Sequence, residues 1–414
     1  MKVVMFTDAY WPRVNGVTVS VDSFSRALIR AGHQVVVICS FYPDSQTIGC
    51  MSTPVMEKRE RDTDPTIIRV PSYPVFISKE DRMAKFHKWF WVSKQLNALQ
   101  PDVIHVNSEF VIGEFGFNYA KLHGVPLVYT FHTLWEDYAV NYIPYVPEFI
   151  LRFFARGITK NMARRADTVI APTSQIQEVL KRYKIKKPVH LLPTGIDPEL
   201  FRNDSSRVKE FRGKLETAFP ALAGKRILLF AGRIGKEKNL SFLLRLLPAI
   251  VKKHPEVVLL VAGNGPDLSF FQEEAGEIGV ADSCVFSGYL DRKDLALTYA
   301  LSDIFVFPSR TETQGLVTIE AMLSGLPVVA IGEMGTITVM GGDNGGFMVK
   351  NDPEEFTARV LDLLEDPELY RKKVAEAKKH ARSWTIDTMT VRLEKIYRDT
   401  IAEVDGSRRK RNWN

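Results

Sequence analysis

Short, apolar, β-branched segments alternate with longer helical stretches along nearly the whole chain of 414 residues. Continuous apolar runs between helices are typical of parallel strands that are covered on both faces. The pattern therefore predicts an α/β protein with two doubly wound, Rossmann-like domains. The expected strands lie at 3–7, 34–40, 102–107, 127–132 and 168–173 in the first half, and at 226–232, 257–263, 284–288, 303–309 and 326–331 in the second.

The chain divides near residues 191–201, where Pro, Gly and Asp cluster ahead of a charged and less periodic stretch. We expect an N-terminal domain at 1–195 and a C-terminal domain at 196–383. A C-terminal helix at 384–404 is expected to return to the first domain, and residues 405–414 form a basic tail, "GSRRKRNWN" at its end.

The overall charge and the cysteines limit the class of protein. A net charge of +6 at pH 7 suits anionic ligands, an anionic membrane surface or nucleic acid. Cys39, Cys50 and Cys284 have neither C-x-x-C nor zinc spacing, which favours a reduced, cytoplasmic compartment. No signal peptide is evident, and no apolar run reaches the roughly 18 residues of a transmembrane helix. We therefore expect a soluble or peripheral membrane protein.

Two classes of protein are disfavoured by what the sequence lacks. A nucleic-acid-binding protein would need a recognisable reading element, and none appears, so we expect no nucleic-acid partner. A dehydrogenase would need a complete glycine fingerprint, whereas Gly263 lies in "VAGNGPD", which lacks the final glycine. This loop can still bring the backbone close to a nucleotide.

Ligands of open α/β sheets bind beyond the carboxyl ends of the strands, so residues that follow strands are the candidates. Asn15-Gly16 opens a helix whose N-terminus could attract phosphate, although a simple turn explains the pair at least as well. Arg233 and Lys238 follow the strand at 226–232 and could converge on one anion, although surface Arg and Lys are usually only solvated.

The stretch "RTETQGLVTIEAMLSGLPVVA" places Glu312 and Glu320 eight residues apart. Glu320 lies among small apolar residues, where a carboxylate is either exposed or met by a polar partner. The amides of Gly315, Leu316 and Val317 begin the helix and can act as free donors. A diphosphate or hydroxylated ligand held there would place sugar hydroxyls beside both carboxylates.

These motifs together closely resemble the GT4 family of retaining glycosyltransferases, which have the GT-B fold. The resemblance rests on Arg233 and Lys238, on Glu312 and Glu320 within "GLVTIEAMLSGLPVVA", and on "PTGID" and "SGYLDRKDL". It implies two Rossmann-like domains that face each other across a cleft. The first would bind the acceptor and the second a nucleotide-sugar donor, with a UDP-sugar expected.

The resemblance also implies roles for single residues. Arg233 and Lys238 would hold the donor diphosphate and Glu320 the nucleotide ribose, while Glu312 would contact the transferred sugar. The remaining donor-binding residues would be Gly16, Gly263, Gly288, Tyr289, Gly315, Leu316 and Val317.

His132 in "YTFHTLW" is the candidate of the first domain. A lone histidine in an apolar run is usually a core residue, but the resemblance places it near the reacting sugar. The implied reaction is a front-face displacement in which the leaving diphosphate accepts the acceptor proton and His132 orients the sugar and stabilises charge. No metal and no cofactor are expected, because Arg, Lys and helix amides neutralise the leaving group.

One loop departs from the family pattern. Many relatives carry Gly-Gly-x-Pro-Glu after the strand at 326–331, whereas this chain reads "IGEMGTITVM". Gly335 and Thr336 can still present amides to phosphate, but the sugar preference of those relatives cannot be transferred.

A basic helix near residues 147–165 is the candidate acceptor or membrane surface. Its residues Arg152, Arg156, Lys160 and Arg164 recur at helical spacing, with Phe153 beside them. Such a helix fits an anionic membrane surface, although the residues alone slightly favour a core helix with a solvated basic face.

The "PxxNGV" start and the basic helix resemble the diacylglycerol glucosyltransferase branch. That implies transfer of glucose from UDP-glucose to a membrane lipid on the inner face of the cell membrane. A soluble sugar, polysaccharide or small-molecule acceptor, or GDP-mannose as donor, are the alternatives.

Overall fold

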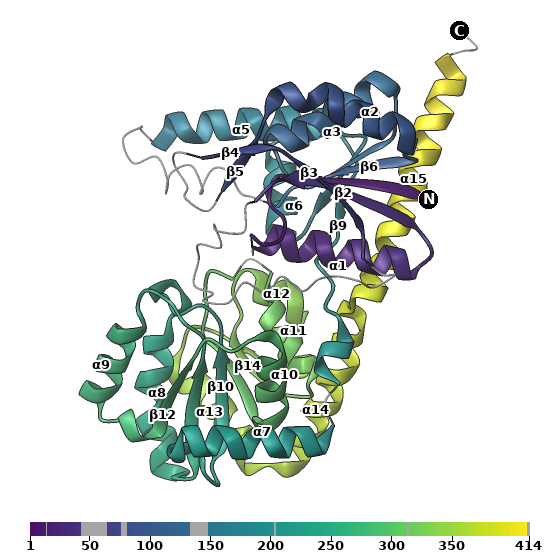
Figure 1. Cartoon of the computed structure of the whole chain (residues 1–414). Helices are drawn as coiled ribbons and strands as arrows, with labels where there is room; N and C mark the ends of the chain where they lie inside the picture. The colour runs from purple at the N-terminus through teal and green to yellow at the C-terminus, as the bar shows by residue number, and fades with distance from the viewer. Residues whose placement is uncertain are drawn as a thin grey trace. The chain divides into compact units, whose positions relative to one another are not determined.

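The computed structural model describes residues 1–13, 15–42, 64–75, 81–132, 148–202, 204–312 and 314–411. The chain forms two compact units, each with its own parallel sheet (Figure 1). Unit 1 contains Met1–Gly195 and Ile386–Asn414, and unit 2 contains Ile196–Thr385. Cys50 and residues 412–414 lie outside the described residues, while Cys39 and Cys284 are buried free thiols.

Unit 1 is built on a parallel sheet with the strand order β3-β2-β1-β6-β7-β8-β9. Its central strands are buried at nearly every position because helices cover both faces, as their continuous apolar sequences predict. The strands are β1 (Lys2–Thr7), β2 (Gln34–Ser40), β3 (Thr66–Val70), β6 (Val103–Val106), β7 (Leu127–Thr130), β8 (Thr168–Ala171) and β9 (Val189–Leu191). Two short antiparallel strands, β4 (Ser72–Pro74) and β5 (Arg82–Ala84), form a separate two-stranded sheet, and Ala84 packs into the core of the unit.

The helices of unit 1 lie on both sides of its sheet, with α2, α3 and α5 on one side and α1 on the other (Figure 1). Trp89 at the start of α2 packs on Phe115 of α3, and Arg165 at the end of α5 forms an ion pair of 2.6 Å with Glu114 of α3. The helices are α1 (Gly16–Arg30), α2 (Trp89–Leu99), α3 (Val111–His123), α5 (Glu148–Arg165) and α6 (Ser174–Arg182).

The C-terminal helix α15 (Ile386–Arg411) is part of unit 1. Buried hydrogen bonds join it to the sheet, since the Tyr397 hydroxyl lies 2.7 Å from Nδ1 of His105 and the Thr400 hydroxyl 2.8 Å from that of Thr168. The helix continues to Arg411, so residues 405–411 are helical. No helix in the described ranges is both long and apolar enough to span a bilayer.

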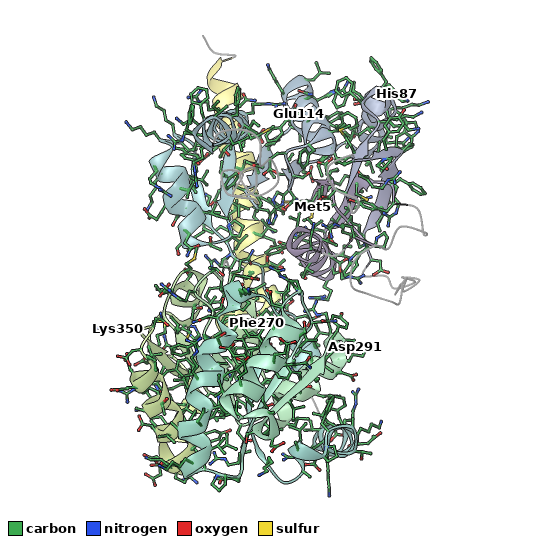
Figure 2. The ribbon with its side chains drawn as sticks, turned by 90° about the vertical axis from the view of Figure 1, so that its left-hand side faces the viewer. Met5, His87, Glu114, Phe270, Asp291 and Lys350 are labelled. Carbon is green, nitrogen blue, oxygen red and sulfur yellow. The ribbon has the colours of Figure 1, made fainter. Side chains whose placement is uncertain are left out.

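Unit 2 has a parallel sheet of order β12-β11-β10-β13-β14-β15. Its strands are β10 (Arg226–Ala231), β11 (Val257–Ala262), β12 (Cys284–Gly288), β13 (Ile304–Phe307), β14 (Val328–Ile331) and β15 (Gly346–Val349). Its helices are α7 (Ser205–Ala218), α8 (Leu240–Lys253), α9 (Leu268–Ile278), α10 (Arg292–Leu301), α11 (Leu316–Leu323), α12 (Gly335–Met340), α13 (Pro353–Glu365) and α14 (Pro367–Ala381). Figure 2 shows the side chains of both units, with Met5 of β1 inside unit 1 and Lys350 at the surface of unit 2.

All of the strands expected from the sequence form, and the α/β prediction is confirmed. The expected strands did not include β3, β9 and β15, which lie at the edges of the two parallel sheets, or the short pair β4 and β5. Edge strands are covered less completely, so they lack the continuous apolar run that identifies central strands. In β9, for example, all of the residues of "VHL" are only partly buried.

The order of strands reverses once in each sheet, between β1 and β6 in unit 1 and between β10 and β13 in unit 2. Loops that leave the carboxyl ends of such neighbouring strands run to opposite faces and leave room for a ligand. These two points in the fold position the candidate site residues.

Candidate active site

The loops after β10 and β13 are joined by polar contacts at the reversal point of unit 2. The Nζ of Lys238 lies 2.7 Å from Oε2 of Glu312, and each side chain is only 18% exposed. The side-chain amide of Asn239 donates to the Pro308 carbonyl at 3.2 Å, and the Thr311 hydroxyl to the Glu237 carbonyl at 3.1 Å. The structure thus brings together two predicted site residues that lie 74 positions apart.

Arg233 lies in the same loop as Lys238 but has a different ionic partner. Its guanidinium pairs with Glu237 at 2.5 Å and is 63% exposed, so it can turn towards a ligand at little cost. The two cations are held by separate carboxylates. A diphosphate bound by both cations would replace Glu237 and Glu312 as their partners.

The start of α11 offers unsatisfied backbone donors. Gly315 caps the helix with a φ of 67°, a left-handed conformation that favours glycine. A Cβ there would also lie 3.2 Å from Cγ2 of Val339. The Thr318 amide donates to the Gly315 carbonyl at 3.0 Å, whereas no described residue accepts from the amides of Leu316 and Val317. These two amides are therefore available to a ligand.

Several buried side-chain atoms around α11 and α12 also have no hydrogen-bond partner among the described residues. Buried polar groups are nearly always hydrogen-bonded, so a group of orphans in one region indicates a missing partner such as a bound ligand or water. The atoms are the hydroxyls of Ser309, Thr318 and Thr336 and Oε1 of Gln314.

Glu320 lies on α11 with a side chain that is 16% exposed. The Tyr299 hydroxyl donates to its Oε2 at 3.2 Å, and Nη2 of Arg292 lies 3.9 Å from Oε1. Burial raises the pKa of Glu320, and both partners oppose that rise. The sequence left open whether Glu320 is exposed or has a polar partner, and the structure supports a polar partner. The Glu320 carboxylate retains capacity for further hydrogen bonds.

The glycines proposed for donor binding differ in whether contacts within the fold require a glycine at that position. At Gly263 the φ is 151° and a Cβ would lie 1.9 Å from the Gly232 carbonyl oxygen, so close packing of two loops already requires glycine. Gly288 has a φ of 73°, and Tyr289 beside it is exposed. At Gly16, by contrast, a Cβ would meet none of the described residues within 4 Å. Contacts with the described part of the chain therefore do not explain the glycine at position 16.

Asn15 and Gly16 form the start of helix α1 rather than a separate turn. The Asn15 side chain accepts from the Thr18 amide at 2.8 Å and caps the helix. Gly16 is the first residue of α1 and is exposed.

A second polar group lies at the reversal point of unit 1, where His132 follows β7. Nε2 of His132 lies 3.1 Å from Oδ1 of Asn107, which follows β6. Burial lowers the pKa of His132 to about 4, so its imidazole is neutral near pH 7. Glu109, also after β6, accepts from the Tyr129 hydroxyl at 2.5 Å.

Asp8 follows β1 and links the end of that strand to the start of α3. Its carboxylate accepts from the Ser108 hydroxyl at 2.6 Å and from the Ile112 amide at 3.0 Å, which caps the start of α3. Burial raises the pKa of Asp8. Asp8, Asn107 and Glu109 were not predicted as site residues. Asp8 and Glu109 follow expected strands and Asn107 ends one, so their positions could have pointed to them.

Helix α5 exposes large apolar side chains as well as basic ones. Phe153 and Phe154 are 73% and 63% exposed, and Phe149 and Ile158 are exposed too. Its buried stripe consists of small or slender residues instead, namely Leu151, Ala155, Thr159, Met162 and Ala163. Of the predicted basic row, Arg156 and Arg164 are exposed, while Arg152 and Lys160 are partly buried. The guanidinium of Arg156 stacks over the Tyr183 ring at 5.2 Å.

Two family matches together cover most of the chain. Residues 14–200 match Glycosyltransferase Family 4, and residues 214–380 match Glycosyl transferases group 1. The boundary between the matches lies where unit 1 gives way to unit 2.

Named relatives extend over both units. The alpha-monoglucosyldiacylglycerol synthase of Streptococcus pneumoniae is 33% identical over 340 residues, which are 80% of this chain and 71% of that protein. The protein of the same name from Acholeplasma laidlawii is 26% identical, over 97% of this chain and 98% of its own. A GDP-mannose-dependent alpha-mannosyltransferase of Mycobacterium tuberculosis is 28% identical, over 93% and 94%.

Solved structures share the fold. HepE of Anabaena superposes with a TM-score of 0.74 at 17% identity, covering 96% of this chain and all of that one. Sucrose-phosphate synthase of Thermosynechococcus elongatus superposes with a TM-score of 0.69 at 20% identity, covering 97% and 99%. The chain therefore belongs to glycosyltransferase family 4, and the protein is a glycosyltransferase with the GT-B fold.

Proposed function

We propose that the protein is a retaining glycosyltransferase that moves glucose from UDP-glucose to a membrane lipid such as diacylglycerol and forms an α-glycosidic bond. The observation that carries the proposal is the similarity to the Streptococcus pneumoniae relative, whose name states a glucosyldiacylglycerol product. The relative from Acholeplasma laidlawii bears the same name and matches nearly the full length of both chains.

Unit 2 supplies the groups that a nucleotide-sugar needs. Lys238 and Arg233 provide positive charge for the diphosphate, and the amides of Leu316 and Val317 provide donors without a partner among the described residues. Glu320 would accept from the ribose hydroxyls and Glu312 from the sugar. The Anabaena relative of this fold was solved with UDP and with UDP and glucose, which agrees with such a donor.

The chemical step exchanges one bond at the anomeric carbon. The acceptor hydroxyl oxygen forms a bond to that carbon on the face from which the diphosphate oxygen departs, and the departing diphosphate takes up the hydroxyl proton. The products are UDP and an α-glucoside. Lys238 and Arg233 stabilise the negative charge of the diphosphate as it leaves, so no metal ion is required. His132 would orient the transferred sugar.

Helix α5 of unit 1 would bring the protein to the membrane that holds the acceptor. Its exposed Phe153 and Phe154 can enter the headgroup region, and Arg156 and Arg164 can meet anionic lipid phosphates. A core helix with only a solvated basic face would bury its phenylalanines. The exposed phenylalanines therefore favour a peripheral membrane enzyme, and we propose that it acts on the inner face of the cell membrane.

A second candidate is transfer of mannose from GDP-mannose to a lipid or soluble acceptor. The relative from Mycobacterium tuberculosis named as GDP-mannose-dependent covers 93% of this chain, which keeps this donor open. The family loop that reads Gly-Gly-x-Pro-Glu in many relatives is altered here. Its sequence therefore does not indicate whether the donor is UDP-glucose or GDP-mannose.

Radiolabelled UDP-glucose and GDP-mannose, each supplied with diacylglycerol-containing vesicles, distinguish these candidates. We expect label from UDP-glucose in the organic extract and none from GDP-mannose. The Lys238→Ala variant should lose the product, whereas Lys253→Ala, which removes an exposed cation paired with Glu365, should retain it. Label confined to a new aqueous product, or transfer from GDP-mannose alone, would contradict the proposal.

A further inference from the structure

Asn107 makes two hydrogen bonds that fix the orientation of its side-chain amide. Nδ2 donates to the His105 carbonyl oxygen at 3.4 Å, so Oδ1 is turned towards Nε2 of His132 at 3.1 Å. Asn107 is buried and cannot exchange these partners for water. The reversed amide would place its NH2 group against Nε2 and its oxygen against a carbonyl oxygen, which loses the second bond.

This orientation determines where the proton of His132 lies. The Oδ1 atom of an asparagine only accepts, so Nε2 of His132 must carry the hydrogen. A neutral imidazole has a single N–H, and the other nitrogen then presents a lone pair. Among the described residues, Asn107 is the one side-chain hydrogen-bond partner of His132, so none of them uses the Nδ1 lone pair.

We propose that Asn107 is a positioning residue that holds His132 with its proton on Nε2, so that the Nδ1 lone pair accepts a hydrogen bond from a hydroxyl group of the substrate. The assignment of the bound partner as a sugar or acceptor hydroxyl rests on the proposed function. The assignment of the proton position rests on the contacts within unit 1 alone.

The surroundings keep His132 in this form. His105 on β6 is also buried, with its pKa lowered to about 3 by burial and by the nearby His132, so two imidazoles would repel if both were charged. Among the described residues, the titratable side chains at this edge of the sheet include Asp8, Glu109 and Tyr129, with Tyr42 bonded to the Asp8 carbonyl and Tyr397 reaching His105 from α15. A lone pair near the anomeric carbon is compatible with the positive charge that develops there, whereas an imidazolium would oppose it.

The proton position can be measured directly by two-bond 1H–15N correlation spectra of the full-length protein labelled on histidine. The His132 signals are assigned from their loss in His132→Gln. We expect a single tautomer with the proton on Nε2 at neutral pH. In Asn107→Ala the two tautomers should interconvert, and in Asn107→Asp the new carboxylate should stabilise the imidazolium.

Asn97→Ala is the matched control. It removes an asparagine whose Oδ1 accepts from the Tyr119 hydroxyl at 2.9 Å in the same unit, away from His132. It should leave the His132 spectrum unchanged. A wild-type His132 protonated on Nδ1, or an unchanged tautomer in Asn107→Ala, would overturn the proposal.

Transferase activity gives a second readout that a merely structural role of Asn107 would not move. We expect Asn107→Asp to lower kcat by about tenfold at neutral pH. The kcat of this variant should recover as the pH rises, because the imidazolium then loses its proton. A loss of activity that is the same at every pH contradicts the proposal. If wild-type protein transfers no sugar from UDP-glucose, the proposed function fails, while the spectra still decide the proton position.

Discussion

At the level of single residues, the carboxylates at the reversal point of unit 2 are held by specific partners rather than by solvent. Glu312 pairs with Lys238, and Glu320 accepts from Tyr299 with Arg292 nearby. Removing a carboxylate from water costs free energy, and the interactions with such partners offset only part of that cost. A ribose would add hydrogen bonds to Glu320, and this gain can be measured.

The Glu320→Ala variant should bind UDP more weakly by roughly 1.5–3 kcal/mol, the value of a hydrogen bond to a charged group. Isothermal titration calorimetry measures this change. Glu274→Ala is the matched control, because Glu274 is also largely buried and is held by a hydroxyl and a guanidinium, those of Ser241 and Arg245. Equal UDP affinity in both variants and the wild type would show that Glu320 only supports the helix.

His105 makes the stability of unit 1 depend on pH. Its pKa is lowered from 6.5 to about 3 by burial, so the folded state holds the neutral ring while the unfolded state takes up a proton below pH 6.5. The stabilising contribution is therefore complete above pH 6.5 and is lost as the pH falls towards 3.

From about pH 7 to about pH 5 the wild type should lose about 2 kcal/mol of unfolding free energy through this histidine. Denaturant unfolding at the two pH values tests this. His105→Gln cannot titrate, so its loss over the same interval should be smaller by that amount, whatever its absolute stability. An identical pH dependence in the two proteins would exclude the linkage.

At the level of elements, α5 is amphipathic in an unusual sense, because its larger apolar side chains are on the exposed side. Leu151 and Ala155 face the core, whereas Phe153 and Phe154 are in solvent. Exposed aromatic residues next to cations are expected of a helix that lies in a membrane interface. The sequence predicted the basic spacing, but it did not show which apolar residues are exposed.

Replacing Phe153 and Phe154 by Ser should lower binding to vesicles that contain anionic lipid by about tenfold, since each ring removes apolar area from water on insertion. Co-sedimentation measures the bound fraction. Val391→Ser, which alters an exposed apolar residue of α15 in the same unit, is the control and should bind like the wild type.

The charge of α5 is tested by Arg164→Glu, because Arg164 is exposed and its reversal spares the stacking of Arg156 on Tyr183. It should weaken binding to anionic vesicles at low salt and have less effect at high salt, where charges are screened. Vesicle binding that neither substitution changes would make α5 an ordinary surface helix.

At the level of the whole molecule, the proposed front-face reaction has a product that can be identified. An α-linked donor should give an α-linked product, and the proton NMR spectrum of the fresh glycolipid should show the small anomeric coupling of an α-glucoside. A β-anomeric proton would contradict the proposed retaining mechanism.

The same reaction should also proceed without a divalent metal ion. Lys238 and Arg233 supply the positive charge that a metal would otherwise bring to the diphosphate. Initial rates of glucose transfer should therefore be unchanged after treatment with EDTA. Loss of activity on chelation, with recovery on addition of Mg²⁺ or Mn²⁺, would show that these side chains are insufficient.

Much of the fold could be predicted because the alternation of apolar strands with helices is a local property of the sequence. A segment such as "VVLLVA" is buried on both faces of a sheet, and its uninterrupted apolar sequence predicts this burial. The edge strands β9 and β15 carry weaker signals because fewer neighbours cover them. The motif around Glu312 and Glu320 was likewise readable, since it is contiguous in the chain.

The sequence by itself therefore determined the two parallel sheets, the family and the loops that carry Lys238, Glu312 and His132. Only the tertiary structure decided which groups meet, such as Lys238 with Glu312 and His132 with Asn107. The reason is that these hydrogen bonds join residues from different strand ends, whose distance depends on strand order and register. Those quantities are set by packing across the whole sheet, and no short stretch of sequence contains them.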